Sequence, residues 1–291
     1  MQIIDSFAEI SARYDALLVD LWGCVHNGVA AYPEAVAALQ AYRAQGGTVC
    51  LLTNSPRPRA GVELQLTDMG VPRDAWDTIA SSGDSARAAM FMGAVGTKIW
   101  LIGNPHDQPF FAPMHLFPDA PAIEQVPLAE AEGIVCTGPF DPFAEPSAMR
   151  PEFLMAKQRG LKLLCANPDI VVDRGETREW CAGALARLYT EMGGESLYFG
   201  KPHPPIYDLA MRRLAEIGKA PPVERILAIG DGLHTDIEGA QGEDMDTLFI
   251  TGGLAAAETG TGTTGGPVAD KLARYLDGTG ISPIFAIGRL R

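Results

Sequence analysis

The chain has 291 residues, of which 47% are hydrophobic and 20% are charged, and its net charge is −13. This length is enough for one elaborate domain or two smaller ones. The acidic balance argues against a nucleic-acid partner and against a membrane surface, because both attract clustered Lys and Arg. An anionic substrate therefore needs a local positive charge, most simply a metal ion.

The cysteines indicate a reducing compartment. The chain has five, they form no CxxC pair, and four of them lie within or beside apolar runs. This pattern predicts reduced thiols in the core. The first residues lack the basic region of a signal peptide, and no apolar run is long enough for a membrane-spanning helix. We therefore expect a cytoplasmic protein.

Short apolar runs alternate with helical patterns along the chain. A helix is predicted from Pro33 to the glycines 46–47, and another with one apolar face at residues 206–217. Strands are predicted at residues 16–19, 48–52, 98–102, 133–137, 162–166 and 225–230. This alternation predicts a parallel sheet covered by helices on both faces. The Gly-, Thr- and Ala-rich residues 252–266 predict a mobile surface loop.

A lone acid, Asp20, follows the first predicted strand and begins the turn Asp20-Leu21-Trp22-Gly23. Open α/β sheets place their chemistry at the carboxyl ends of their strands. Asp20 is therefore the first candidate for a catalytic residue.

Polar residues also follow later strands. Thr53, Asn54 and Ser55 lie between the strand 48–52 and a new helix, where backbone N–H groups can bind an anion. The same residue types also cap helices, so both interpretations stay open. Lys201 follows the apolar residues 197–199 and is either a ligand-binding lysine or a solvated loop lysine.

Two acids follow the last of the predicted strands. Asp231 ends the strand 225–230, and Asp236 lies five residues further on. Two carboxylates at one turn suit a hard divalent cation, although either can instead cap a helix. Because Asp20, Thr53 and Lys201 also follow strands, we expect one crevice to hold all of these side chains.

Four segments, DLWG, LLTN, GKP and GDGLHTD, resemble in order the four motifs of the haloacid dehalogenase (HAD) superfamily. The long interval between Thr53 and Lys201 resembles class IIA, the NagD-like and p-nitrophenylphosphatase-like branch. The segment Asn167-Pro168-Asp169 is similar to a motif of that branch. The resemblance implies a doubly wound parallel-sheet core, at residues 1–83 and 181–291, with an inserted α/β cap at residues 84–180.

The resemblance also implies roles for these residues. Asp20 would be the nucleophile that becomes an aspartyl-phosphate. The resemblance assigns a Mg²⁺ ion to Asp20, Asp231, Asp236 and the backbone carbonyl of Trp22, and it assigns the phosphate to Thr53, Asn54 and Lys201, with Lys201 also catalytic. Asn167, Asp169 and His26 are tentative substrate contacts, the substrate is a small phosphorylated metabolite, and the cap implies a homodimer.

Trp22 departs from the family pattern, because this position normally carries the acid/base aspartate. General acid/base catalysis is worth about 10²–10⁴-fold, and an indole cannot supply it. Three interpretations follow. The enzyme acts on substrates with good leaving groups, His26 replaces the missing acid, or the protein binds a phosphorylated ligand or partner without turnover. His26 can equally be a loop histidine with a structural hydrogen bond. We expect a Mg²⁺-dependent hydrolase of small organic phosphates that is weak or restricted to good leaving groups.

Overall fold

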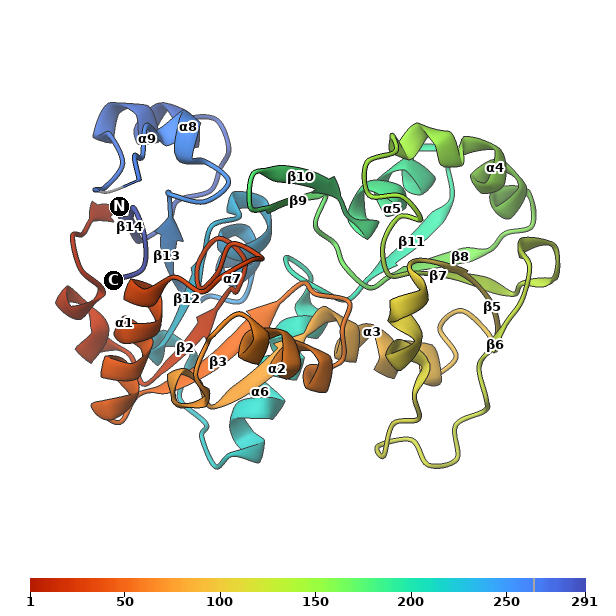
Figure 1. Ribbon diagram of the computed structural model, residues 1–291, viewed down its shortest axis with the longest axis horizontal. Helices are drawn as coiled ribbons and strands as arrows, with labels where there is room; N and C mark the ends of the chain where they lie inside the picture. The colour runs from red at the N-terminus through yellow and green to blue at the C-terminus, as the bar shows by residue number, and fades with distance from the viewer. Residues whose placement is uncertain (264) are drawn as a thin grey trace. The chain divides into compact units, whose positions relative to one another are not determined.

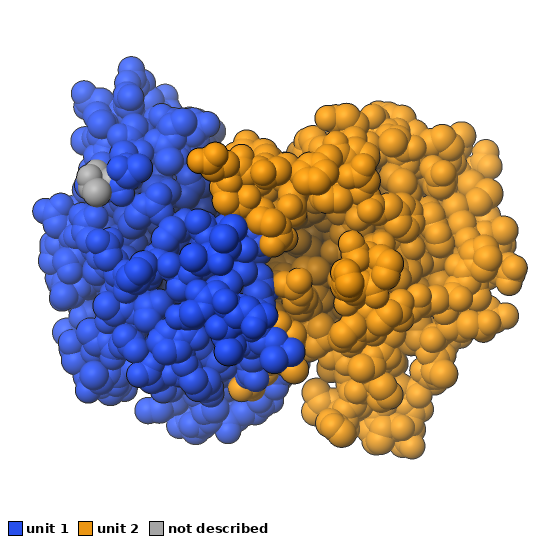
Figure 2. Space-filling view, in the orientation of Figure 1, with its two compact units in different colours: residues 1–53, 63–80, 207–291 blue, residues 54–62, 81–206 orange. Residues whose placement is uncertain are grey.

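The computed structural model describes residues 1–263 and 265–291, and it divides into the two units coloured in Figure 2. Unit 1 comprises residues 1–53, 63–80 and 207–291, and unit 2 comprises residues 54–62 and 81–206. A seven-stranded sheet organises unit 1, and a five-stranded sheet organises unit 2. The predicted mixed α/β architecture with parallel sheets is therefore confirmed (Figure 1).

The sheet of unit 1 has the strand order β1-β14-β13-β12-β2-β3-β4. Its strands are β1 (Gln2–Ile3), β2 (Ala16–Val19), β3 (Thr48–Thr53), β4 (Thr78–Ser81), β12 (Ile226–Gly230), β13 (Asp246–Ile250) and β14 (Phe285–Ile287). The helices that accompany it are α1 (Pro33–Ala44), α2 (Arg59–Asp68), α6 (Pro204–Glu216), α7 (Glu238–Gly242), α8 (Ala256–Thr259) and α9 (Ala269–Leu276).

Burial explains why the central strands form where the sequence predicts them. Every residue of β2, β3 and β12 is buried, as parallel strands covered on both faces require. Helix α1 begins at Pro33, whose fixed φ suits the first helical position, and it buries Ala35, Leu39 and Tyr42 on one face.

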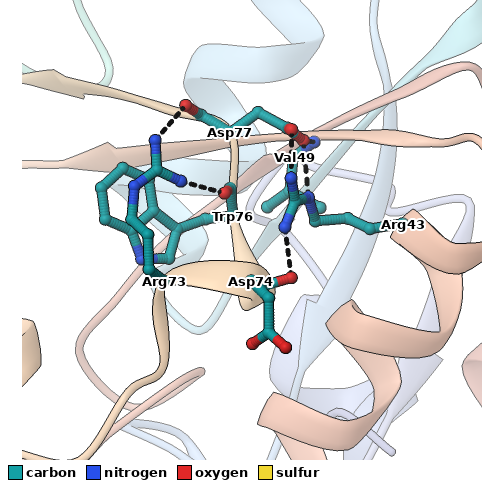
Figure 3. A network of polar contacts seen from close by, with 6 residues as sticks. All are labelled: Arg43, Val49, Arg73, Asp74, Trp76 and Asp77. Atoms are coloured by element: carbon teal, nitrogen blue, oxygen red, sulfur yellow. Dashed lines mark hydrogen bonds and ion pairs between the residues drawn. The ribbon is translucent and has the colours of Figure 1, made fainter.

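A polar network holds the last turn of α1 against the chain that enters β4 (Figure 3). Arg43 binds Asp77 through Nε (3.0 Å) and Nη2 (2.6 Å), and the same carboxylate accepts the Val49 N–H of β3 (2.8 Å). The Arg73 guanidinium lies 3.7 Å from the ring centroid of Trp76 and donates to the Trp76 carbonyl (2.6 Å). These contacts fix β3, whose carboxyl end carries Thr53.

The sheet of unit 2 has the strand order β11-β8-β7-β5-β6, and a hairpin, β9–β10, accompanies it. Its strands are β5 (Lys98–Ile102), β6 (Glu124–Gln125), β7 (Gly133–Cys136), β8 (Lys162–Cys165), β9 (Val171–Arg174), β10 (Thr177–Trp180) and β11 (Glu195–Tyr198). Its helices are α3 (Ser82–Phe91), α4 (Arg150–Gln158) and α5 (Ala182–Glu191).

Successive residues of these strands point to opposite faces, so each face of the sheet has its own apolar cluster. Leu163 and Cys165 of β8 belong to a cluster with Phe153 of α4 and Tyr189 of α5. Leu164, between them, belongs to the cluster that α3 contributes to. Helices therefore cover both faces of this second sheet, as the sequence pattern predicts.

The structure places residues 181–206 in unit 2, whereas the predicted boundaries assign them to the core. The physical reason is that β11 pairs with β8, with Tyr198 opposite Cys165, and that α5 packs on the same sheet. Among the helices of the described residues, none is long and apolar enough to cross a membrane.

Candidate active site

Asp20 and Asp231 follow neighbouring strands of unit 1. β2 pairs in parallel with β12, with Val19 opposite Ile229, and the Asp20 N–H donates to the Ile229 carbonyl (2.8 Å). From β2 the chain continues to β3 on one side, and it returns much later through β12 on the other. Such a switch of direction is where open α/β sheets bind ligands. Both carboxylates are buried, with 7% and 6% of each residue exposed.

The thiol of Cys24 lies close to these two carboxylates. Asp20, Cys24 and Asp231 each offer one ligand atom, and these atoms lie within 4.8 Å of one another. Two buried carboxylates this close repel each other unless a proton or a cation compensates their charge. The donor set therefore fits a divalent cation. The sequence interpretation missed Cys24, although its position directly after DLWG was a signal.

Two backbone segments confine the Asp231 carboxylate. A Cβ at Gly23, where φ is +78°, would lie 2.1 Å from its Oδ2, and a Cβ at Gly253 would lie 1.9 Å from the same atom. The Leu254 N–H donates to Oδ2 (2.9 Å). Only glycine permits this close approach, so both glycines serve the placement of Asp231.

Trp22 packs within its own turn. Its ring meets the His26 ring edge to face, with 5.2 Å between centroids. A Cβ at Gly28 would lie 2.2 Å from Cζ2 of Trp22. His26 is 1% exposed, and its Nδ1 accepts the Gly28 N–H (3.1 Å). This geometry gives His26 the structural hydrogen bond expected of a loop histidine.

Asp236 lies in the π-helical turn Leu233–Ile237 and is 6% exposed. Its Oδ2 accepts the Gly232 N–H (3.0 Å), which is a cap-like bond. Among the described residues, the cluster of converging donor atoms comprises Asp20, Cys24 and Asp231 without Asp236. The predicted role of Asp236 as a metal ligand stays a prediction.

In unit 2, the Asn54 side chain joins two other predicted site residues. Its Oδ1 accepts the Lys201 N–H (2.7 Å), and its Nδ2 donates to the Lys201 carbonyl (3.2 Å) and to Oδ1 of Asp169 (2.8 Å). Asn167 in turn accepts the Asp169 N–H (3.0 Å). Lys201 is only 2% exposed. Of the two alternatives for Lys201, the solvated loop lysine is therefore wrong.

Thr53 is the last residue of β3 and is 6% exposed.

The cysteines are free and buried, as predicted. Burial raises the pKa of the Cys165 thiol to about 12 and raises the pKa of Cys136 as well. These thiols therefore stay protonated and are unsuited to nucleophilic chemistry.

Comparisons with known families agree with this geometry. A family model described as haloacid dehalogenase-like hydrolase matches residues 17–115, and a second HAD hydrolase-like model matches residues 198–275. The crystal structure of a haloacid dehalogenase-like hydrolase from Brucella suis is 38% identical to this chain, with a TM-score of 0.85. The match covers 99% of this chain and 100% of that one.

Phosphatases from two other organisms are also similar. The p-nitrophenyl phosphatase of Archaeoglobus fulgidus shares the fold (TM-score 0.67, 19% identity, 95% of this chain and 96% of that one). The D-glycerol 3-phosphate phosphatase of Mycobacterium tuberculosis is 26% identical over 85% of this chain, and the chain spans 66% of that relative's length. A glycerol phosphate phosphatase from the same organism, solved with magnesium, has a TM-score of 0.62 at 22% identity, over 84% of this chain and 70% of that one.

Proposed function

This chain belongs to the haloacid dehalogenase-like hydrolase family, and from that premise we propose that it is a Mg²⁺-dependent phosphatase of small organic phosphates. One observation carries the proposal. The buried carboxylates of Asp20 and Asp231 converge at the carboxyl ends of β2 and β12, where the order of the strands reverses. A buried nucleophile beside a second acid suits phosphoryl transfer, in which positioning and charge compensation do most of the work.

In the proposed reaction, a carboxylate oxygen of Asp20 attacks phosphorus in line with the leaving oxygen. The bond between phosphorus and the leaving oxygen breaks, and that oxygen keeps the electron pair. Water then cleaves the aspartyl-phosphate and restores Asp20. Asp20, the Trp22 carbonyl, Asp231 and Asp236 would hold the Mg²⁺ ion, which supplies positive charge against the repulsion between the carboxylate and the phosphate.

The proposal assigns phosphate binding to Lys201, Thr53 and the Asn54 N–H. Lys201 supplies a cation in a protein whose net charge is −13. The Asn54 amide is engaged by the Lys201 backbone and by Asp169, so its side chain orders the lysine. Charge and orientation for the phosphate thus come from ordered groups, which need little rearrangement on binding.

Trp22 shapes the substrate range in this proposal. Without the usual aspartate, the leaving group is not protonated by this turn, which costs about 3–5 kcal/mol of barrier for a poor leaving group. Aryl and acyl phosphates leave with little protonation and are the expected substrates. The M. tuberculosis relative acts on D-glycerol 3-phosphate, an alkyl phosphate, so a sugar or polyol phosphate is the natural comparison substrate.

The remaining parts of the proposal concern surroundings and assembly. Asn167 and Asp169 are proposed to contact the leaving group. The buried reduced cysteines favour the cytoplasm, and a homodimer formed through the cap is the proposed assembly.

The test measures release of p-nitrophenol and of phosphate from p-nitrophenyl phosphate, acetyl phosphate and D-glycerol 3-phosphate, with and without Mg²⁺. Asp20→Asn should abolish turnover. Asp15→Asn is the matched control, because Asp15 precedes the same strand at its other end, where its partner is Arg225. Turnover that survives Asp20→Asn, or that ignores Mg²⁺, would contradict the proposal.

A second candidate function is favoured by Trp22 alone: a protein that binds a phosphorylated ligand or partner without turnover. It predicts a Mg²⁺-dependent thermal shift with phosphate esters and no released phosphate. Detection of an aspartyl-phosphate on Asp20 by mass spectrometry would exclude this alternative.

A further inference from the structure

The segment that follows β13 is built around buried threonines. The sequence interpretation expected a mobile surface loop at residues 252–266, of which residue 264 lies outside the described residues. The expectation of a loop is wrong for residues 256–259, which form helix α8. Ala255 is 1% exposed, Thr259 is fully buried and Thr261 is 8% exposed. Threonines can be buried this deeply because their hydroxyls pair with one another and with the backbone.

The Thr259 hydroxyl lies between the two ends of a short glycine-containing segment. Thr251 and Ala255 flank Gly252-Gly253-Leu254. The Thr259 hydroxyl lies 3.3 Å from the Thr251 carbonyl and 2.8 Å from the Ala255 carbonyl. Two adjacent glycines would otherwise leave this segment with wide backbone freedom. The hydroxyl has one proton, so it donates to one of these carbonyls at a time. It adds to the backbone bonds that also hold the segment, from the Gly252 N–H to the Gly288 carbonyl (2.7 Å) and from the Ala256 N–H to the Gly253 carbonyl (3.1 Å).

The hydroxyls of Thr251, Thr259 and Thr261, which we call the threonine clamp, form a continuous chain. Thr259 and Thr261 lie 2.8 Å apart, Thr261 donates to Thr251 (2.8 Å), and Thr251 donates to the Ile287 carbonyl of β14 (3.1 Å). The clamp is therefore attached to the sheet of unit 1 through β14.

The segment held by the clamp reaches Asp231. The Leu254 N–H donates to Oδ2 of Asp231 (2.9 Å), and Gly253 packs so closely that a Cβ there would lie 1.9 Å from that oxygen. This backbone contact sets the rotation of the carboxylate. Groups that orient a metal ligand in this way change metal affinity by about 10–100-fold when they are lost.

We propose that the threonine clamp positions Asp231 for the divalent cation, so that Thr259 is a positioning residue of the metal site. This inference rests on the proposed function, because it takes Asp231 as a ligand. Loss of the Thr259 hydroxyl loosens the Gly252-Gly253-Leu254 segment, whose backbone bonds to Gly288 and Ala256 remain, and the Leu254 N–H then holds the carboxylate less firmly in one orientation.

The test measures Mn²⁺ binding directly by electron paramagnetic resonance, with urea unfolding as a separate measure of stability. Thr259→Val should weaken Mn²⁺ binding about tenfold, and Thr259→Ser, which keeps the hydroxyl, should restore it. In Thr259→Val, the activity lost at low Mg²⁺ should return at saturating Mg²⁺. A loss of folded protein would not be reversed in this way.

Thr247→Val is the matched control. Thr247 is a fully buried threonine of β13 whose hydroxyl oxygen accepts the Ile284 N–H (3.3 Å), away from the clamp. Equal Mn²⁺ affinity in Thr259→Val and Thr247→Val would overturn the clamp proposal. If Thr259→Val does not fold, Thr261→Val replaces it with the same expected weakening. No Mn²⁺ binding by the wild-type protein would instead overturn the proposed metal site and the clamp's role with it.

Discussion

Gly28→Ala tests how firmly Trp22 is held in the turn after β2. Gly28 has a φ of +82°, and an added Cβ would lie 2.2 Å from Cζ2 of the Trp22 indole. The left-handed backbone costs a side chain about 1–2 kcal/mol. The overlap with the indole adds about 1–3 kcal/mol, as overpacking does elsewhere. We therefore expect the free energy of unfolding to fall by about 2–5 kcal/mol, a large part of a typical domain's stability.

A double-mutant cycle separates these two contributions. Urea unfolding is followed by far-UV circular dichroism in the wild type, Gly28→Ala, Trp22→Ala and the double variant, since tryptophan fluorescence would change with Trp22 itself. Once the indole is gone, Gly28→Ala should cost only the backbone part, about 1–2 kcal/mol. An equal cost of Gly28→Ala in both backgrounds would refute the packing of Trp22 against residue 28.

The remaining predictions concern two residues of the site and one ion pair at the other end of β2. Trp22→Asp should raise activity on alkyl phosphates by up to about 10²-fold, and more than on aryl phosphates, because it supplies a general acid; equal gains in the two series would show that Trp22 mainly shapes the pocket. Cys24→Ser should lower the affinity for Cd²⁺ more than that for Mg²⁺ in competition calorimetry, since a thiol favours soft cations; an unchanged ratio would place the thiol outside the metal site. Hydrogen bonds from Arg225 lower the pKa of Asp15, so this pair stabilises the fold above the ordinary aspartate pKa and loses that contribution as the pH falls through the lowered value. Arg225→Gln should therefore raise the pKa of Asp15 in an NMR titration, and a constant pKa would contradict the assignment.

Local patterns in the sequence were enough to predict the elements that carry the site. β2, β3 and β12 are short apolar runs, and each ends at or directly before a polar residue whose chemistry is visible without a structure. Helix α1 is predicted by Pro33 and by the spacing of its apolar residues. These signals depend on neighbours a few residues away, which is why they can be read from one chain.

Pairing between distant segments was not visible in the same way. The predicted boundary after residue 180 differs from the division into units because β11 joins the sheet of unit 2 through β8, and nothing in its own four residues says which sheet it enters. Residues 252–266 predict a loop because they are rich in Gly, Thr and Ala and lack a hydrophobic period, and the sequence does not show that the hydroxyls of Thr259 and Thr261 pair with each other and with Thr251.

The DLWG turn itself shows where the division lies. From the sequence alone, Asp20 is a nucleophile candidate and Trp22 a side chain that cannot act as an acid, because both properties belong to the residues themselves. Only the tertiary structure brings Asp231 and Cys24 to within 4.8 Å of Asp20, and only it places Trp22 against Gly28 and His26. The reason is physical: side-chain chemistry is local, whereas the approach of Asp231 depends on the pairing of β2 with β12, which lie far apart in the chain. The contacts of Cys24 and Trp22 depend on the backbone conformation of their own turn.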